Sequence, residues 1–151
     1  MEGDKRMKEM LLAVCVLRGN DLAPCLRGMV RFCDTSCGVC VDAKVSGLPP
    51  NATGFYGFHI HEGTRCSPYD FSDAGGHYNP GDTAHPLHAG DMPMIMAGAS
   101  GTGRLCFVTP RFAVRDVIGR AVIVHGDRDD YTSQPSGNAG ARIGCGIIRR
   151  V

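Results

Sequence analysis

The feature that most constrains this chain is the concentration of histidine in one short segment. Five of its six histidines lie between Gly57 and Asp91, and the sixth, His125, ends a short apolar run. A lone histidine is usually a solvated or core imidazole, whereas several histidines beside a carboxylate are typical of metal sites. The segment therefore predicts a metal centre.

The spacing of the histidines predicts the element that carries each. His59 and His61 are two residues apart in an apolar stretch with the character of a strand. Both imidazoles then share one face, since side chains alternate along a strand. His125 ends the run 120–125, which we expect to be a strand beside the first one. Such an arrangement completes an all-nitrogen site of the kind that suits copper.

The remaining donors follow in a segment rich in Gly, Pro and Asp, which indicates a loop. This loop contributes three imidazoles and one carboxylate, from His77, His85, His88 and Asp91. That combination is the tetrahedral set that zinc prefers in structural sites.

The rest of the chain predicts an all-β fold. Short apolar runs alternate with Gly, Pro and Asp breaks, and no extended helical periodicity appears. We expect an eight-stranded antiparallel β-barrel or sandwich. The expected strands cover residues 10–17, 26–33, 39–46, 55–61, 94–97, 104–109, 121–125 and 141–148, with a turn at 116–119.

Length and charge limit the organisation and the partners. The 151 residues suffice for one domain, which we place at residues 10–151 after a flexible N-terminal segment, 1–9. A net charge of +1 argues against a general nucleic-acid or membrane-surface role. No run of eighteen apolar residues is present, so we expect no membrane-spanning helix.

The N-terminus allows two interpretations. Basic residues followed by the apolar run 10–17 outline a secretory signal. Acidic residues stand among the bases, however, and residues 18–21 form a poor cleavage site. We favour a first strand, and with it a cytoplasmic location.

Six short motifs follow one another along the chain: 13–19, 57–62 (GFHIHE), 76–80 (GHYNP), 88–91 (HAGD), 124–125 (VH) and 137–146 (GNAGARIGCG). Taken together in this order, they resemble the copper/zinc superoxide dismutases, and the resemblance covers roughly residues 11–148. The compact loops look more like those of bacterial members than of animal ones.

The resemblance implies a Greek-key barrel with long metal-binding and active-site loops. It also implies an enzyme that converts superoxide to oxygen and hydrogen peroxide by cycling a copper ion. The family's copper ligands fall on His59, His61, His77 and His125. Its zinc ligands fall on His77, His85, His88 and Asp91, so that His77 bridges both metals and serves in proton transfer.

Other roles are implied by position in the motifs. Arg142 matches the arginine that meets the incoming anion, and Asp129 matches a carboxylate that orients one ligand on each metal. Cys66 and Cys145 match the disulfide that ties the metal-bearing loop to the last strand. The resemblance further implies a homodimer. A protein that delivers copper to the chain is a further expected partner.

Two questions stay open at this point. Cys33, Cys37 and Cys40 follow a spacing that can ligate a metal, but free thiols on a hairpin are the simpler interpretation. A copper storage or transfer module is the alternative to an enzyme. Such a module needs neither the zinc set nor Arg142. Cysteines without an assignment are Cys15, Cys25, Cys33, Cys37, Cys40 and Cys106.

Overall fold

The computed structural model describes residues 12–151. The expected flexible segment 1–9 and the first two residues of the first expected strand lie outside the described residues. Across residues 12–151, no helix is long and apolar enough to span a membrane.

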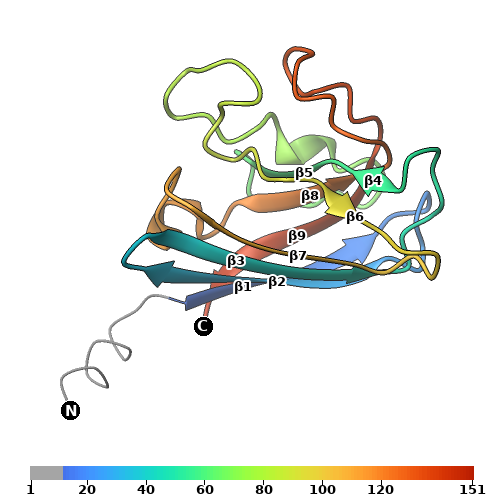
Figure 1. Ribbon diagram of the computed structural model, residues 1–151, viewed down its shortest axis with the longest axis horizontal. Coiled ribbons are helices and arrows are strands. Elements are labelled where there is room, and N and C mark those ends of the chain that lie inside the picture. Colours follow the sequence, from blue (N-terminus) through green and yellow to red (C-terminus); the bar gives the residue numbers. More distant parts are fainter. Residues whose placement is uncertain (1–11) are drawn as a thin grey trace.

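The architecture is a curled antiparallel sheet of the barrel or sandwich type, as the sequence predicts (Figure 1). Seven strands follow one another in the order β5-β8-β9-β1-β2-β3-β7, and β4 pairs with β6 in a separate small sheet. The strands in residues 12–151 are β1 (Leu12–Gly19), β2 (Arg27–Thr35), β3 (Gly38–Ser46), β4 (Phe55–Tyr56), β5 (Phe58–His61), β6 (Ile95–Met96), β7 (Gly103–Thr109), β8 (Ala121–His125) and β9 (Arg142–Arg150).

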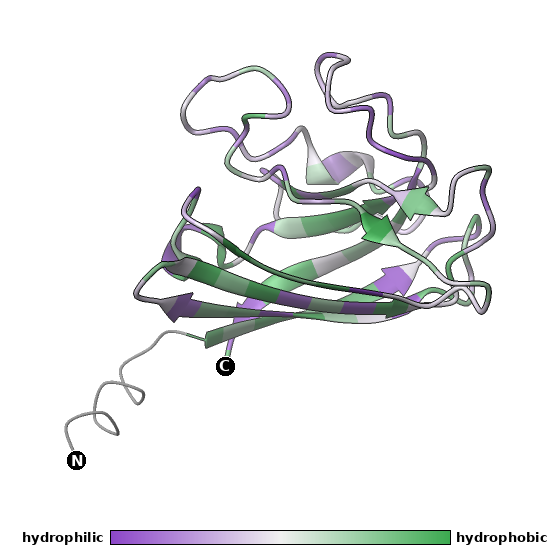
Figure 2. Ribbon diagram, viewed as in Figure 1, coloured by the Kyte–Doolittle hydropathy of each residue, from purple (hydrophilic) through white to green (hydrophobic). Residues whose placement is uncertain are grey.

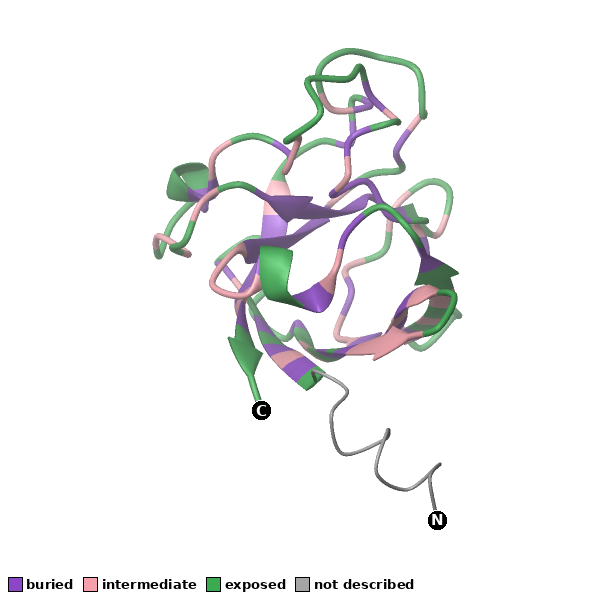
Figure 3. Ribbon diagram, turned by 90° about the vertical axis from the view of Figure 1, so that its left-hand side faces the viewer, coloured by how far each residue is buried: buried purple, intermediate pink, exposed green. Residues whose placement is uncertain are grey.

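Most of the strands bury one face. On β2, Val30 and Phe32 point into the core, whereas the alternating residues Met29 and Arg31 are exposed. Figures 2 and 3 show the resulting apolar, buried lining of the curled sheet. By contrast, β5 and β8 are buried along their whole length. Their second face is therefore covered by something other than the core, and this is where the long loops lie.

Two long loops cover β5 and β8 on the same side of the molecule (Figure 1). We call residues 62–94 the metal loop and residues 126–141 the C-terminal loop. A disulfide between Cys66 and Cys145 joins the metal loop to β9, which confirms the predicted pairing. The metal loop also contains a single helical turn, η1 (Ser72–Ala74), that the sequence did not predict.

The expected strand 55–61 is interrupted at Gly57, where the chain leaves its pairing with β6 and joins β8. A Cβ atom at Gly57 would lie 2.7 Å from the Cβ of Ala139 in the C-terminal loop. The missing side chain thus lets the C-terminal loop approach the point where the two sheets meet. The prediction of one continuous strand is wrong for this reason.

The expected turn at 116–119 is also only partly right. A short helix, α2 (Val114–Val117), takes up its first half and buries Val114 and Val117 in the core, so that the turn is confined to residues 118–119. The carboxylate of Asp116 accepts a hydrogen bond of 3.0 Å from the backbone N–H of Ala113, which stabilises the first turn. Four residues are too few for a helical period to be visible in the sequence.

Candidate metal centre

Three donor histidines come from the sheet. On β5, Phe58 and Ile60 belong to the core, and His59 and His61 alternate with them, so both imidazoles face the loops. His125 ends β8, the strand paired with β5, and its backbone N–H donates to the carbonyl of Gly57 at 2.8 Å. The predicted neighbourhood of the two strands is confirmed.

The metal loop docks on β5 through its backbone. The carbonyl of Ile60 accepts a 2.8 Å bond from Tyr78, and the N–H of Ile60 donates at 2.9 Å to Gly90. Isolated bridges also pair His59 with Asp91 and His61 with His77. Backbone bonds to one strand therefore place the donors of the loop over those of the sheet.

The donors form two groups that share one residue. His59, His61, His77 and His125, which we call the histidine group, have ligand atoms within 4.8 Å of one another. The loop group consists of His77, His85, His88 and Asp91. The atoms of His59, His77, His85 and Asp91 also lie within 4.8 Å of one another.

His88, rather than His59, completes the loop group on chemical grounds. Its Nδ1 atom lies 3.2 Å from Nδ1 of His77 and 3.2 Å from a carboxylate oxygen of Asp91. His59 instead commits Nε2 to Asp129 and keeps Nδ1 for the histidine group. The structure thus brings together all of the donors that the sequence predicts.

Several buried ring nitrogens in these groups have no hydrogen-bond partner among residues 12–151. A buried polar atom without a partner costs about 1–3 kcal/mol, so a group of them in one place calls for a ligand. The unpaired atoms are Nδ1 of His59, Nε2 of His61, Nε2 of His77, Nδ1 of His85 and Nε2 of His125. Such a set of nitrogen lone pairs fits a copper ion in the histidine group.

The carboxylate of Asp129 fixes the tautomers of two of these rings. It accepts bonds from Nε2 of His59 at 2.7 Å and from Nε2 of His85 at 2.8 Å. With the proton on Nε2, each ring presents the lone pair of Nδ1 to the donor groups. Burial by itself would raise the pKa of Asp129, but the bonds from His59 and His85 lower it below its usual range.

Burial keeps His61 and His125 of the histidine group uncharged at ordinary pH. Burial lowers the pKa of His61 to about 2 and that of His125 to about 3. The Nδ1–H of His61 donates a hydrogen bond to the carbonyl of Gly75 at 2.9 Å, and that of His125 donates to the carbonyl of Gly140 at 3.2 Å. Each Nε2 is therefore an unprotonated donor, which is the form that binds a metal ion.

The C-terminal loop must pass very close to this network. Gly137 has a φ of +73°, and a Cβ atom there would lie 2.0 Å from a carboxylate oxygen of Asp129 and 2.6 Å from Nε2 of His85. Only glycine fits, because any side chain would collide with the bond between these two residues. Close packing against the donor groups thus explains Gly137, the first glycine of the GNAGAR motif.

A cavity opens from the histidine group to the surface, and one permanently charged side chain, that of Arg142, lines it. His61, His77 and His125 line it together with Arg142 and Ser136. The Arg142 guanidinium is half-buried and donates to the carbonyls of Phe71 at 2.8 Å and Gly75 at 2.7 Å. These bonds hold the guanidinium beside the imidazoles, where a small anion can meet it, while Glu62 places one carboxylate in the lining of the same cavity.

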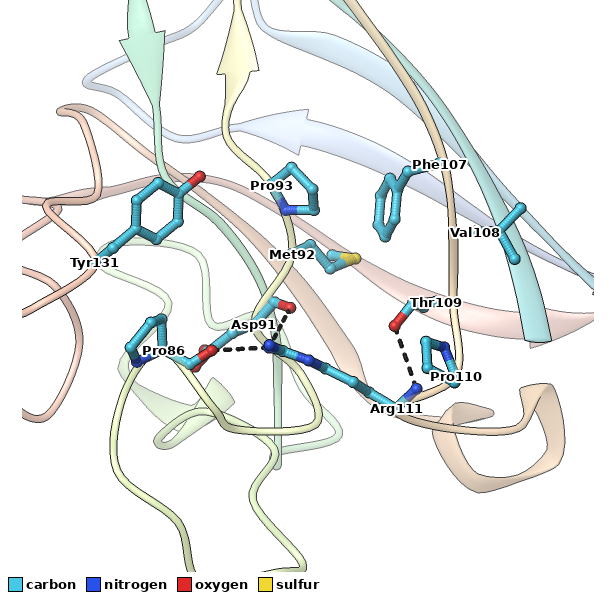
Figure 4. Close-up of a pocket in the computed structure, with 10 residues that line it drawn as sticks. All are labelled: Pro86, Asp91, Met92, Pro93, Phe107, Val108, Thr109, Pro110, Arg111 and Tyr131. Atoms are coloured by element: carbon cyan, nitrogen blue, oxygen red, sulfur yellow. Dashed lines mark hydrogen bonds between the residues drawn. The ribbon is translucent and has the colours of Figure 1, made fainter. Parts of the chain in front are cut away.

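Sequence reasoning missed a second arginine. Arg111 follows β7 and reaches the outside of the metal loop, where a pocket lies (Figure 4). Its Nη1 atom donates to the carbonyls of Pro86, His88 and Asp91 at 2.8, 3.3 and 3.4 Å. Arg111 thus fastens the stretch that carries the loop donors, and no local sequence pattern announces a contact over 20 to 25 residues.

The chain also resembles known proteins. The family model of copper/zinc superoxide dismutase matches residues 26–148. The chain belongs to the copper/zinc superoxide dismutase family. Superoxide dismutase [Cu-Zn] 1 of Aquifex aeolicus (strain VF5) is 40% identical over 136 residues, which cover 81% of this chain and 79% of that protein.

Two other relatives extend the picture. The superoxide dismutase [Cu-Zn] of Deinococcus radiodurans is 38% identical over 144 residues, covering 82% of this chain and 78% of the relative. The copper chaperone for superoxide dismutase of Rattus norvegicus is 32% identical over 161 residues, covering 98% of this chain and 56% of the chaperone. Copper/zinc superoxide dismutase relatives thus match most of the chain, and its donor groups fit the two metals of the family name.

Proposed function

We propose that this chain dismutates superoxide with copper in the histidine group and zinc in the loop group. Copper would be held by His59, His61, His77 and His125, which offer the unpaired atoms Nδ1 of His59 and Nε2 of the other three. Zinc would be held by His77, His85, His88 and the carboxylate of Asp91. The observation that carries the proposal is the set of buried, unpaired ring nitrogens that converge beside Arg142.

The two metals, when bound, supply one-electron redox chemistry from copper and a fixed positive charge from zinc. His77 is the ligand common to both groups, since Nδ1 lies 2.8 Å from Asp91 and Nε2 belongs to the histidine group. The peroxide product requires two protons. His77 lines the cavity, and we propose that its Nε2 atom, when it is not a metal ligand, takes up one proton and passes it to the product, while the second proton comes from solvent.

Arg142 binds and orients the superoxide anion. Its guanidinium carries a permanent charge and has five N–H donors, of which the bonds to Phe71 and Gly75 use two. The remaining donors are free to meet an anion in the cavity. An Arg142→Ala variant should dismutate superoxide more slowly and with a weaker dependence on ionic strength, because salt screens this charge. An unchanged salt dependence would contradict this role.

The decisive experiment compares the dismutation rate of the copper- and zinc-loaded protein with that of a His125→Ala variant. Fast turnover that the variant loses, while it still binds zinc, supports both the activity and the copper site. The alternative is copper storage or transfer, which the likeness to the rat chaperone favours. Slow turnover with both metals bound would support that alternative instead.

We propose that the chain forms a homodimer through the outer face of β1 and β9. Leu12 and Val16 are 45% and 48% exposed there, and Val14 and Ile147 line an adjacent groove. Light scattering should give twice the mass of 16.1 kDa, and a Val16→Glu variant should shift the equilibrium to the monomer. A monomeric wild type would refute this part of the proposal.

A copper donor protein completes the proposal and is supported by the same rat relative. Protein made in a foreign host should then contain less copper than protein from its own cells. Copper added to the purified protein should remove the difference. Equal copper content in both preparations would argue against a dedicated donor.

A further inference from the structure

Three free thiols lie side by side on the outer face of the sheet, on the strands β2, β3 and β7. Cys33 pairs directly with Cys40 across β2 and β3. On the other side of β3, Cys106 pairs with Asp42, which is two residues along from Cys40 on the same face. Cys40 therefore lies between the other two, and we call Cys33, Cys40 and Cys106 the thiol cluster.

The thiols are accessible and close enough to influence one another. Cys33 and Cys40 are partly exposed, and Cys106 is exposed. The pKa of Cys40 is raised, first by burial and then by the thiols of Cys106 and Cys33. A thiol must lose its proton to bind a metal ion just as it must to react, so the raised pKa of Cys40 favours neither use. The observation that favours a ligand is the position of Cys40 between two other solvent-accessible thiols.

We propose that the thiol cluster is a second metal site, which binds one Cu(I) ion through Cys40 and Cys106 with Cys33 as the third ligand. The site is separate from the histidine and loop groups, since it lies on other strands. It does not depend on the proposed dismutation.

Cu(I) fits these donors better than zinc does. Soft thiolate sulfur suits both Cu(I) and zinc, but a structural zinc ion takes four ligands. The cluster supplies three, and the carboxylate of Asp42, which pairs with Cys106 across β3 and β7, is engaged by Arg104 at 3.4 Å. Each sulfur that binds the ion releases its proton to solvent. The negative charge that forms is partly balanced by Arg104 and by Arg31, which pairs with Asp42 across β2 and β3.

Binding requires a small rearrangement of the side chains. Among residues 12–151, the donor groups that already lie within 4.8 Å are the two described above, so the thiol cluster must close around the ion. The Cys33 thiol donates to the carbonyl of Asp34 at 3.5 Å, a weak bond that rotation of the partly exposed side chain breaks.

The structure changes the membership that the sequence suggested. Cys37 lies at the tip of the hairpin, with its sulfur 3.7 Å from the hydroxyl of Ser36. Its place is taken by Cys106, more than sixty residues further along the chain and adjacent only through the register of β3 and β7. Cys15 is buried with its pKa raised to about 12, and Cys25 is an exposed thiol on a loop.

The test is an anaerobic Cu(I) titration against a chromophoric Cu(I) chelator. The protein is first loaded with one copper and one zinc, and its thiols are counted by alkylation after denaturation. We expect six alkylated cysteines and one further Cu(I) ion held against the chelator. The Cys40→Ser and Cys106→Ser variants should each lose this ion, and Cys33→Ser should release it at a lower chelator concentration. The Cys25→Ser and Cys37→Ser variants should keep it.

Three results would overturn the proposal. One is the absence of a further tightly bound ion in the wild type, and another is its retention by Cys40→Ser. The third is a count of four alkylated cysteines, since a disulfide would then occupy the ligands. Because the titration begins with both donor groups filled and reads only bound Cu(I), a failure of dismutation leaves its result unaffected.

Discussion

The donors of the metal centre are held in two different ways. His59, His61 and His125 come from strands, so they take their places when β5 and β8 pair. His85, His88 and Asp91 come from the metal loop, which has little regular structure of its own. Donors on a loop are positioned by contacts between the loop and other elements, and the metal loop makes several such contacts.

Besides the backbone bonds to β5, four ties within residues 12–151 hold the loop donors. The disulfide Cys66–Cys145 anchors the loop to β9, and Arg111 binds three of its carbonyls. Asp129 binds the ring of His85, and the side chain of Gln134 exchanges two hydrogen bonds with the backbone of the same residue, at 2.9 and 2.7 Å. Strand-held donors should therefore tolerate the loss of a tie that loop-held donors do not.

The largest effect should follow loss of the disulfide. In a Cys66→Ser, Cys145→Ser variant, the free energy of unfolding should fall by about 4 kcal/mol, because a bridge across 79 residues restricts the unfolded chain. Zinc affinity should fall more than copper affinity. Denaturant unfolding and chelator competition measure both, with Cys25→Ser as the matched control. An equal fall in zinc and copper affinity would show that the loop-held donors depend on the disulfide no more than the strand-held donors do.

Asp129→Asn should weaken both groups, because this carboxylate serves one donor of each. An amide cannot accept well from both His59 and His85, and loss of such a partner typically costs roughly 10- to 100-fold in metal affinity. Chelator competition for each metal is the measurement. Asp130→Asn is the control, since that partly exposed carboxylate bonds only Thr132 and Ser133 among the described residues. A loss confined to zinc would show that His59 does not need this bond.

Arg111→Met should act on the loop group alone. The variant keeps much of the aliphatic packing but loses the three carbonyl contacts, and charged hydrogen bonds of this kind are worth about 1.5–3 kcal/mol. We expect zinc affinity to fall roughly tenfold and copper affinity to stay the same. Arg115→Gln is a control on an exposed arginine. Parallel losses of copper and zinc would mean that Arg111 supports the whole fold instead.

Gln134→Ala should give the smallest change. It removes two hydrogen bonds to the backbone of His85 at a part-buried position, which are worth about 1 kcal/mol each at most sites. Zinc dissociation should become a few times faster, as measured by transfer to a chelator. Copper release should keep its wild-type rate, and a change there would blur the line between the two sets of donors.

Much of this could be predicted from the sequence, because the signals are local. Alternation gave the strands, and the spacing of His59 and His61 gave their shared face. The roles of Asp129 and Arg142 depended on the resemblance, since an isolated charge has no pattern of its own. Their contacts support those roles, which remain proposals.

What could not be predicted is long-range. Arg111 contacts carbonyls 20 to 25 residues away, and Cys106 reaches Cys40 only through strand register. The break at Gly57 depends on the approach of Ala139, eighty-two positions later. None of these contacts leaves a mark on neighbouring residues, so only the folded chain reveals them.

The carboxylate of Asp129 has one more consequence. Because its two oxygens bond His59 in one donor group and His85 in the other, an ion that draws one ring into place also steadies the partner of the second ring. The two occupancies would then be thermodynamically linked, and by reciprocity copper would favour zinc by the same factor as zinc favours copper. The metal centre is in this sense a cooperative unit, in which Asp129 is the residue that joins the two donor groups.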